Sequence, residues 1–492
     1  MPALAIRYGL TFGAPAAAAL AGLLVAATAA AHALRPAVLP PLSVATVLGA
    51  AAALGGFMVA RGYPEARLLS AAGAFAVTAV VTCALLDRVA VRSGNMTSVD
   101  GPSPFTETTG SARFAAVGEL AASGPIQRIT LFTGVPAWVV TGYAEARELL
   151  AHPAVVKMPG GGPHELPPDV EAGMERHLLN ANPPDHTRLR RLVTAAFTQR
   201  RIAALAPRIQ EITDTLLDDL DSGDGPVDLV SGFGYPLPIT VITELLGVPR
   251  RNREEFRRWS AVIVNGSVYP EEAYVDAARS MVGYIRELIV AKRADPGDDL
   301  FSDLIALRDG GDRLSEDELS SMAFLLLVAG HETTVNLICT GTYNLLTHPE
   351  QLDLLRAEPE RLPAAVEELL RFDGPLQVPI PSVTAAPVQV GDVTIPEGEV
   401  VLPALLAANR DPARFAAPDT LDITRTPAPH LAFGHGIHHC VGAPLARLEG
   451  RIAIGSLITR FPALRLANPE AEPERFPGLL MNGLSALPVT LR

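Results

Sequence analysis

The sequence predicts a mainly α-helical fold with small β-sheets, preceded by three transmembrane helices. Two observations lead to this fold class. Apolar residues recur at helical spacing through most of residues 202–346, whereas the runs that read as strands are few and short. The first 94 residues differ, because they hold three apolar runs that lack Asp, Glu, Lys and Arg. We therefore expect a membrane segment, residues 1–94, followed by a larger helical domain.

Composition limits the class of protein and its partners. At 492 residues and 48% hydrophobic, the chain can bury a large core. Its three cysteines, Cys83, Cys339 and Cys440, form no disulfide framework, which favours a reducing compartment for the catalytic part. Residues 1–100 carry a net charge of +3 and the remainder −16. This acidic balance predicts that the protein has no nucleic-acid partner.

The three apolar runs span residues 11–34, 41–60 and 68–86, and prolines and charged residues separate them. About 20 residues suffice to cross a bilayer, and a signal peptide would explain only the first run. We therefore expect a multi-pass protein of the cell membrane, in contact with the lipid bilayer. Arginines are equally numerous on the two sides, so the positive-inside rule gives no orientation. The large domain is assigned to the cytoplasm on the grounds of the motifs described below.

Residues 95–109 form a polar linker with a Gly-Pro-Ser-Pro sequence, and the second domain is predicted to span residues 110–492. Residues 159–168, which include three consecutive glycines, read as an irregular loop of the kind that often serves as a lid. Two predicted helices end at residues 122 and 150. The other predicted helices cover residues 202–220, 233–246, 253–264, 271–292 and 316–346. The predicted strands are residues 126–132, 137–141, 388–390 and 400–402.

The stretch of residues 433–442 carries the clearest chemical signal, Phe-Gly-His-Gly-Ile-His-His-Cys-Val-Gly. Cys440 stands where this Gly-rich loop gives way to a helical pattern, so the free N–H groups of a helix start can favour its thiolate. Gly434, Gly436 and Gly442 let the backbone turn tightly and pass close to a flat group. The loop therefore suits a planar cofactor.

Two plainer interpretations of the loop exist. A single cysteine after a glycine turn is often a small buried hydrophobic residue. Alternatively, His435, His438 and His439 beside Cys440 could indicate zinc. The loop lacks the arrangement of a four-ligand zinc site, and the sequence contains no Cys-x-x-Cys pair to complete one.

Three other motifs combine charge with helical spacing. His186 and Arg190 lie four residues apart on one helix face, and a guanidinium suits a carboxylate ligand. The segment Ala-Gly-His-Glu-Thr-Thr, residues 329–334, interrupts an apolar helix, which is costly unless its polar groups find partners or do chemistry. A hydrogen-bonded cluster that bends the helix is the alternative. Glu368 and Arg371 form an i, i+3 pair.

Together, these motifs resemble those of the cytochrome P-450 monooxygenases, from about Thr106 to the C-terminus. Phe-Gly-x-Gly-x-His-x-Cys-x-Gly is similar to the haem-binding loop of that family, which implies that Cys440 is the axial ligand of the iron of haem b. Asp-His-x-x-x-Arg resembles the helix whose His and Arg hold the haem propionates. The residues that the resemblance assigns to the cofactor are His186, Arg190, Ala329, Gly330, Phe433, Gly434, His438, Cys440 and Gly442.

The resemblance also implies an activity. A bacterial-type enzyme of this family would use O2 to oxidise an apolar small molecule, with electrons from a separate ferredoxin and its reductase, since no flavin or iron–sulfur segment follows. Glu332 and Thr333 would be the catalytic acid and alcohol that deliver protons, and Gly330 would permit a local widening of the helix. Glu368, Arg371 and Arg425 would form a structural triad. The alternative is a membrane-anchored haem sensor or electron-transfer protein without turnover.

One position departs from the family pattern. Where relatives usually carry an arginine that reaches a haem propionate, this chain has Ser382. Serine cannot replace that charge. We expect His186, Arg190 and His438 to hold the propionates, with one donor missing.

Overall fold

The computed structural model describes residues 104–158, 164–223, 225–249, 253–309 and 314–492. The chain divides into two compact units, Met1–Met96 and Thr97–Arg492, and all described residues belong to the second. The predicted transmembrane helices, residues 11–34, 41–60 and 68–86, and most of the predicted linker lie outside the described residues. The fold below is that of the second unit.

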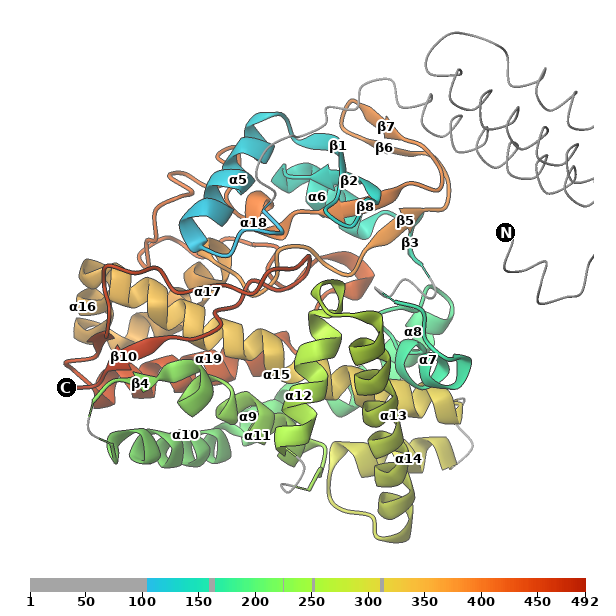
Figure 1. Cartoon of the computed structure of the whole chain (residues 1–492), viewed down its shortest axis with the longest axis horizontal. Helices are drawn as coiled ribbons and strands as arrows, with labels where there is room; N and C mark the ends of the chain where they lie inside the picture. The colour runs from blue at the N-terminus through green and yellow to red at the C-terminus, as the bar shows by residue number, and fades with distance from the viewer. Residues whose placement is uncertain (1–103, 159–163, 224, 250–252, 310–313) are drawn as a thin grey trace, which may run out of the picture. The chain divides into compact units, whose positions relative to one another are not determined.

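The second unit is mainly helical with small sheets, as the sequence predicts (Figure 1). The α-helices are α5 (Gly110–Ala122), α6 (Tyr143–Ala151), α7 (Pro168–Glu175), α8 (Asp185–Ala196), α9 (Gln199–Ala204), α10 (Ala206–Asp221), α11 (Pro236–Leu245), α12 (Arg253–Val264), α13 (Glu271–Ala294), α14 (Leu300–Asp309), α15 (Glu316–Thr347), α16 (Pro349–Ala357), α17 (Leu362–Phe372), α18 (Leu405–Ala408) and α19 (Ala443–Arg460). Where one helix was expected over residues 202–220, the chain forms α9 and α10, with Pro207 in the first turn of α10. Proline is favoured there because its missing N–H would have no partner.

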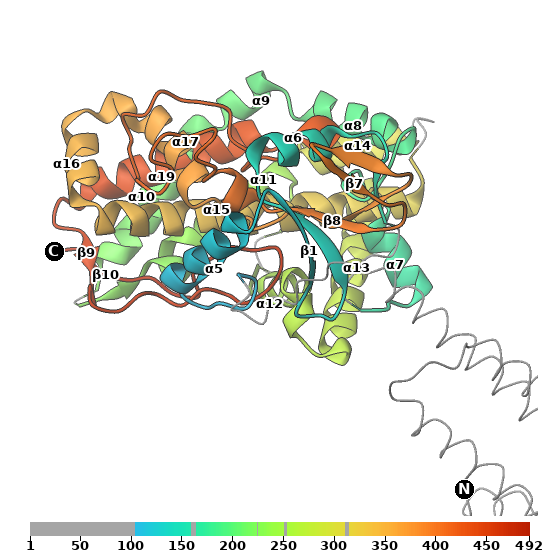
Figure 2. The same ribbon diagram turned by 90° about the horizontal axis from the view of Figure 1, so that it is seen from above.

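Helix α15 is the central helix of this unit. Ser315 and Glu318 form the predicted capping box at its start: the Ser315 hydroxyl accepts from the Glu318 N–H, and the Glu318 carboxylate accepts from the Ser315 N–H. The helix packs against α7, α11, α13, α17 and α19, and Figure 2 shows it running through the middle of the helical part. Among the described residues it alone is long and apolar enough to cross a membrane, but 78% of its apolar window is buried within the fold. It is therefore a core helix.

The main sheet has five strands in the order β1-β2-β8-β5-β3. The strands are β1 (Ile126–Thr130), β2 (Pro136–Val140), β3 (Val155–Lys157), β4 (Val227–Asp228), β5 (Ser382–Thr384), β6 (Val388–Val390), β7 (Val393–Ile395), β8 (Val400–Pro403), β9 (Arg465–Leu466) and β10 (Pro488–Thr490). Strands β3 and β5 were not expected from the sequence. They pair antiparallel, with Lys157 opposite Ser382.

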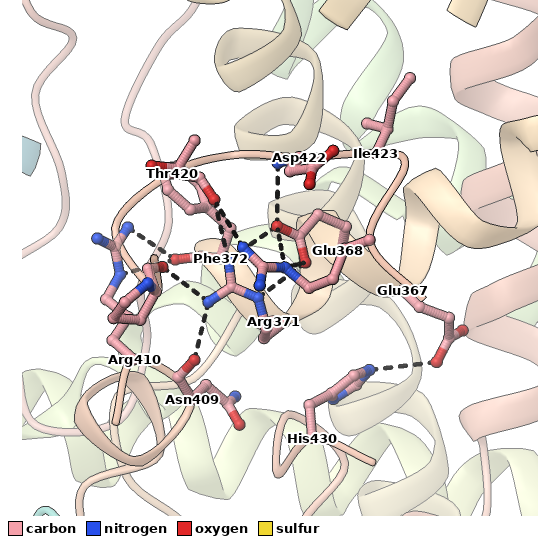
Figure 3. Close-up of polar contacts among 12 residues, drawn as sticks. Glu367, Glu368, Arg371, Phe372, Asn409, Arg410, Thr420, Asp422, Ile423 and His430 are labelled. Atoms are coloured by element: carbon pink, nitrogen blue, oxygen red, sulfur yellow. Dashed lines mark hydrogen bonds and ion pairs between the residues drawn. The ribbon is translucent and has the colours of Figure 1, made fainter. Parts of the chain in front are cut away.

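Glu368 and Arg371 of α17 pair with each other (Figure 3), and Arg425 binds the same carboxylate. Arg371 donates from Nε and Nη2 to the two oxygens of Glu368, both at 2.8 Å, and its remaining N–H groups reach the carbonyls of residues 409, 418 and 420. Arg425 lies 3.2 Å from the same carboxylate. Glu368 also accepts the N–H of Asp422 at 3.1 Å. One buried carboxylate therefore fixes a helix and the loop of residues 416–425.

Replacing Glu368→Gln is expected to lower the free energy of unfolding by about 3–5 kcal/mol, because two arginines are left without their shared anion. Glu367→Gln on the same helix is the matched control. Glu367 pairs with Arg447, but its side chain is 25% exposed against 4% for Glu368. Its loss should cost about 1 kcal/mol or less. Urea unfolding followed by circular dichroism measures both, and equal losses would refute a special role for Glu368.

Candidate functional site

The Cys440 loop is shaped by its glycines and by α6. Gly434 and Gly436 have φ of +69° and +72°, a left-handed conformation that favours glycine. A Cβ on Gly436 would lie 2.6 Å from the Leu150 carbonyl oxygen at the end of α6. The Cys440 N–H donates to the Phe433 carbonyl at 2.9 Å and closes the loop. Gly442 differs, because its φ of −82° is open to any residue.

Cys440 lies at the start of α19. Its sulfur accepts hydrogen bonds from the backbone N–H groups of Gly442 and Ala443. Desolvation by the surrounding loop holds the pKa of the Cys440 thiol above its usual value, and these two N–H groups and the Arg190 guanidinium lower it only in part. Cys339, by contrast, is fully buried in α15, where desolvation raises its pKa. Of these two cysteines, only Cys440 combines access with donors that favour a thiolate.

A cluster of nitrogen donors lies beside this loop. The rings of His186, in α8, and His438 approach edge to face with centroids 4.5 Å apart. Burial lowers the pKa of His438 to about 3 and also lowers the pKa of His186, so both rings are neutral at pH 7. Nε2 of His186 and Nδ1 of His438 are buried and find no hydrogen-bond partner in the described part of the chain. Arg190 Nη1 donates to the His439 carbonyl at 2.6 Å.

The two histidine nitrogens without a partner allow a check of whether these residues fit a haem. A buried polar atom without a partner is costly, so it indicates a missing hydrogen-bond partner, and a neutral imidazole can place its N–H on that nitrogen. The carboxylates of haem propionates are acceptors, and His186, Arg190 and His438 offer the matching donors. The residues expected at the propionates are therefore brought together, and their chemistry fits the cofactor.

The polar segment of α15 contacts α12. Ser260 Oγ lies 3.2 Å from His331 Nε2 and donates to Glu332 Oε1 at 3.3 Å. His331 Nδ1 lies 2.7 Å from the Leu327 carbonyl, so this nitrogen carries the proton. Burial raises the pKa of Glu332, but the contacts with His331 and Ser260 outweigh it and hold the pKa below its usual range. Glu332 is thus a carboxylate with a neighbouring hydroxyl and imidazole.

Ser260 was missed by sequence reasoning. It is fully buried, on a helix that was recognised only by its apolar spacing. A polar residue on the buried face of an amphipathic helix is the signal that could have identified it.

Two residues of α15 that were expected to have a role in the chemistry, Thr333 and Gly330, make specific contacts. The Thr333 hydroxyl donates to the Ala329 carbonyl at 2.9 Å, the bond to the preceding turn that serine and threonine often make. The α-helix continues through Gly330, and a local widening there stays a prediction. A Cβ on Gly330 would lie 2.9 Å from Ile242 of α11. Close packing of α11 on α15 explains this glycine.

Ser382, the residue that departs from the family pattern, lies beside Lys157. Lys157 Nζ donates to Ser382 Oγ at 3.0 Å and to the Ile380 carbonyl at 2.6 Å. Sequence reasoning missed Lys157, because the pairing of β3 with β5 joins residues 225 positions apart.

Comparison with known proteins gives close relatives. The family model for Cytochrome P-450 matches residues 271–486. Cytochrome P-450 107B1 of Saccharopolyspora erythraea is 50% identical over 74% of this chain and 92% of its own length. The 6-deoxyerythronolide B hydroxylase of the same organism is 44% identical over 76% and 94%. The structure of the tirandamycin C-bound P-450 monooxygenase TamI has a TM-score of 0.71 at 42% identity, covering 77% of this chain and 97% of its own.

These relatives correct the predicted location. A multi-pass protein of the cell membrane with a cytoplasmic haem domain was expected, and that prediction is wrong. The bacterial relatives are matched over 92–94% of their own length by only 74–76% of this chain, so they provide no counterpart for a multi-pass segment. The apolar helix that the structure does describe, α15, is buried in the protein core.

The extent and identity of these matches, together with the Cys440 loop and the donor cluster beside it, identify the enzyme class. Relatives named as hydroxylases are matched over nearly their whole length, which establishes an oxidoreductase that incorporates oxygen from O2. The cofactor of this class is thiolate-ligated haem b. The chain belongs to the cytochrome P-450 family and is a haem-dependent monooxygenase.

Proposed function

We propose that this monooxygenase hydroxylates or otherwise oxidises a medium-sized, largely apolar molecule and receives its electrons from a separate ferredoxin and ferredoxin reductase. The observation that carries the proposal is the Glu332 carboxylate in the core helix α15, held by His331 of the same helix and by Ser260 of α12. A protein that only binds haem or passes electrons has no need for an acid in that place. Bacterial relatives of the same class support the choice of electron donors.

Cys440 is proposed as the axial thiolate. Its support is the pair of N–H groups from Gly442 and Ala443 on the sulfur. When bound, the haem supplies the redox chemistry, and a thiolate ligand favours cleavage of the O–O bond. Phe433 closes the loop behind the sulfur by accepting the Cys440 N–H.

Replacing Cys440→Ser should abolish the red-shifted Soret band of the ferrous carbon monoxide complex, because that band requires a thiolate on the iron. Cys339→Ser is the control, since Cys339 is buried in α15 away from any donor that would favour its thiolate. It should keep the band. A band that survives in the Cys440 variant would overturn the assignment of the ligand.

The proposed proton path starts at Glu332. The Ser260 hydroxyl has one proton and can donate it to Glu332 Oε1 or to the Arg257 carbonyl. It can therefore donate to Glu332 while Glu332 is ionised and turn to the Arg257 carbonyl when Glu332 has taken up a proton. Thr333 donates to the Ala329 carbonyl, which leaves its two lone pairs free to accept from water. Glu332 is the proposed proton donor and Thr333 the residue that orients water.

Thr333→Ala and Glu332→Gln should have different effects on turnover. Without the Thr333 hydroxyl, reduced cofactor continues to be consumed while product per cofactor falls by about tenfold or more. Glu332→Gln keeps the shape but cannot take up and release a proton, so consumption itself should slow by about 100-fold. Both quantities are measured together as product formed and cofactor oxidised.

Thr334→Ala provides the matched control. It removes a buried hydroxyl from the next position of the same helix and should leave the ratio of product to cofactor unchanged. A normal ratio in Thr333→Ala, or an equal loss in Thr334→Ala, would remove Thr333 from the proposed path.

The substrate is proposed by class only. Pocket walls are expected from residues 158–178, 265–269, 325–329 and 376–381, where Leu, Val, Pro and Gly predominate. Relatives 44–47% identical include a 6-deoxyerythronolide B hydroxylase and a vitamin D(3) 25-hydroxylase. Both names support a largely apolar substrate. 6-Deoxyerythronolide B and vitamin D(3) are therefore the first molecules to screen for ligand-induced shifts of the Soret band.

The domain division is also proposed. Residues 110–492 would form the haem domain, with residues 95–109 as its linker, because the described core and the Cys440 loop lie within that range. A truncated chain that starts at Asn95 should bind haem and give the same carbon monoxide spectrum as the full chain. Loss of haem on truncation would show that earlier residues belong to the domain.

A further inference from the structure

The chain uses lysine very sparingly. It contains 38 arginines and two lysines, Lys157 and Lys292. Both lysines are buried, at 6% and 7% exposed. Buried ammonium groups need an anion or a set of acceptors. Lys292 has its anion, because its Nζ lies 2.6 Å from Asp299.

Lys157 lacks a comparable partner. The carboxylates of the described residues all lie beyond ion-pair distance from it, and its two acceptors, the Ile380 carbonyl and the Ser382 hydroxyl, are neutral. Desolvation lowers the pKa of Lys157 to about 8, which is the consequence of burying an ammonium without an anion. Its third N–H remains to be satisfied.

The main sheet places Lys157 next to Ser382, the position where relatives usually carry an arginine. In the β3–β5 pair, Lys157 is directly opposite Ser382. Opposite residues on antiparallel strands have Cβ atoms about 5 Å apart, so long side chains from the two positions reach the same region. Two cations opposite each other would repel, whereas one cation and a small hydroxyl are compatible.

The donor cluster beside the Cys440 loop also favours an anion. His438 and His186 hold the two nitrogens without a partner described above, and Arg190 carries a further charge. These three nitrogen-bearing side chains come from α8 and the Cys440 loop, and Lys157 adds a cation from β3 at the place where relatives usually carry an arginine.

We propose that Lys157 supplies the cationic contact to a haem propionate that an arginine at position 382 would otherwise make, with the Ser382 hydroxyl holding the ammonium in place. An ammonium is a point charge without the planar fork of a guanidinium, so it makes one strong contact where arginine can make two.

The first test measures how fast the holoenzyme loses haem to an excess of apomyoglobin. Lys157→Met preserves length and removes the charge, so haem should leave about tenfold faster, as expected for one charged hydrogen bond. Adding Ser382→Arg to that variant should bring the rate back to within about threefold of the original. Ser382→Arg alone should give no such gain, because it adds a second cation opposite the first.

Lys292→Met is the matched control, since it removes the other buried lysine. It should lower the unfolding temperature but leave the rate of haem loss unchanged at temperatures where the protein is folded. A purely structural role for Lys157 would give the opposite pattern: faster haem loss that follows the loss of stability and that Ser382→Arg does not reverse.

A second measurement needs no variant at position 157. Because the chain has two lysines, labelling lysine with 13C at the ε carbon gives two signals, and Lys292→Arg assigns them. The Lys157 signal should shift between the paramagnetic ferric form and the diamagnetic ferrous carbon monoxide form, while the Lys292 signal stays. A Lys157 signal that does not respond to the iron would overturn the proposal, as would failure of Ser382→Arg to restore haem retention.

Discussion

The burial of α15 is the constraint on which the rest of the domain depends. A helix of 32 residues with this many apolar side chains must be covered on nearly every face, and α7, α11, α13, α17 and α19 cover it. Gly330 lets α11 approach it closely. Once the helix is enclosed, a charged group on it needs partners inside the protein, and Glu332 finds them in Ser260 and His331. The same packing that stabilises the fold thus prepares the carboxylate for its proposed role.

A second consequence of enclosure concerns the histidines. His186 and His438 are buried beside cationic side chains, so their rings stay neutral, and each ring keeps one N–H to donate. At the proposed haem site, neutral donors would meet a propionate without adding a further positive charge beside Arg190.

The features that could be predicted from the sequence are those whose residues lie close together along the chain. The capping box of Ser315 and Glu318 and the pair of Glu368 and Arg371 depend on a spacing of three residues, and the structure contains both. Arg425 was added to that pair by family resemblance, and it lies on the same carboxylate. The residues that were missed, Ser260 and Lys157, reach their partners across 72 and 225 positions of the chain. Short strands such as β3 and β5 carry too few residues for an alternating pattern, so their register, and with it the contact of Lys157, became visible only in the fold.

The scarcity of lysine also determines the chemistry of the surface. With both lysine amines buried, the positive side chains that the described domain offers to solvent are guanidiniums. Guanidiniums are planar, stay charged at every physiological pH and form paired hydrogen bonds with carboxylates. An acidic electron carrier would therefore meet directional contacts on this domain, and reagents that attack amines would leave its exposed face largely unmodified.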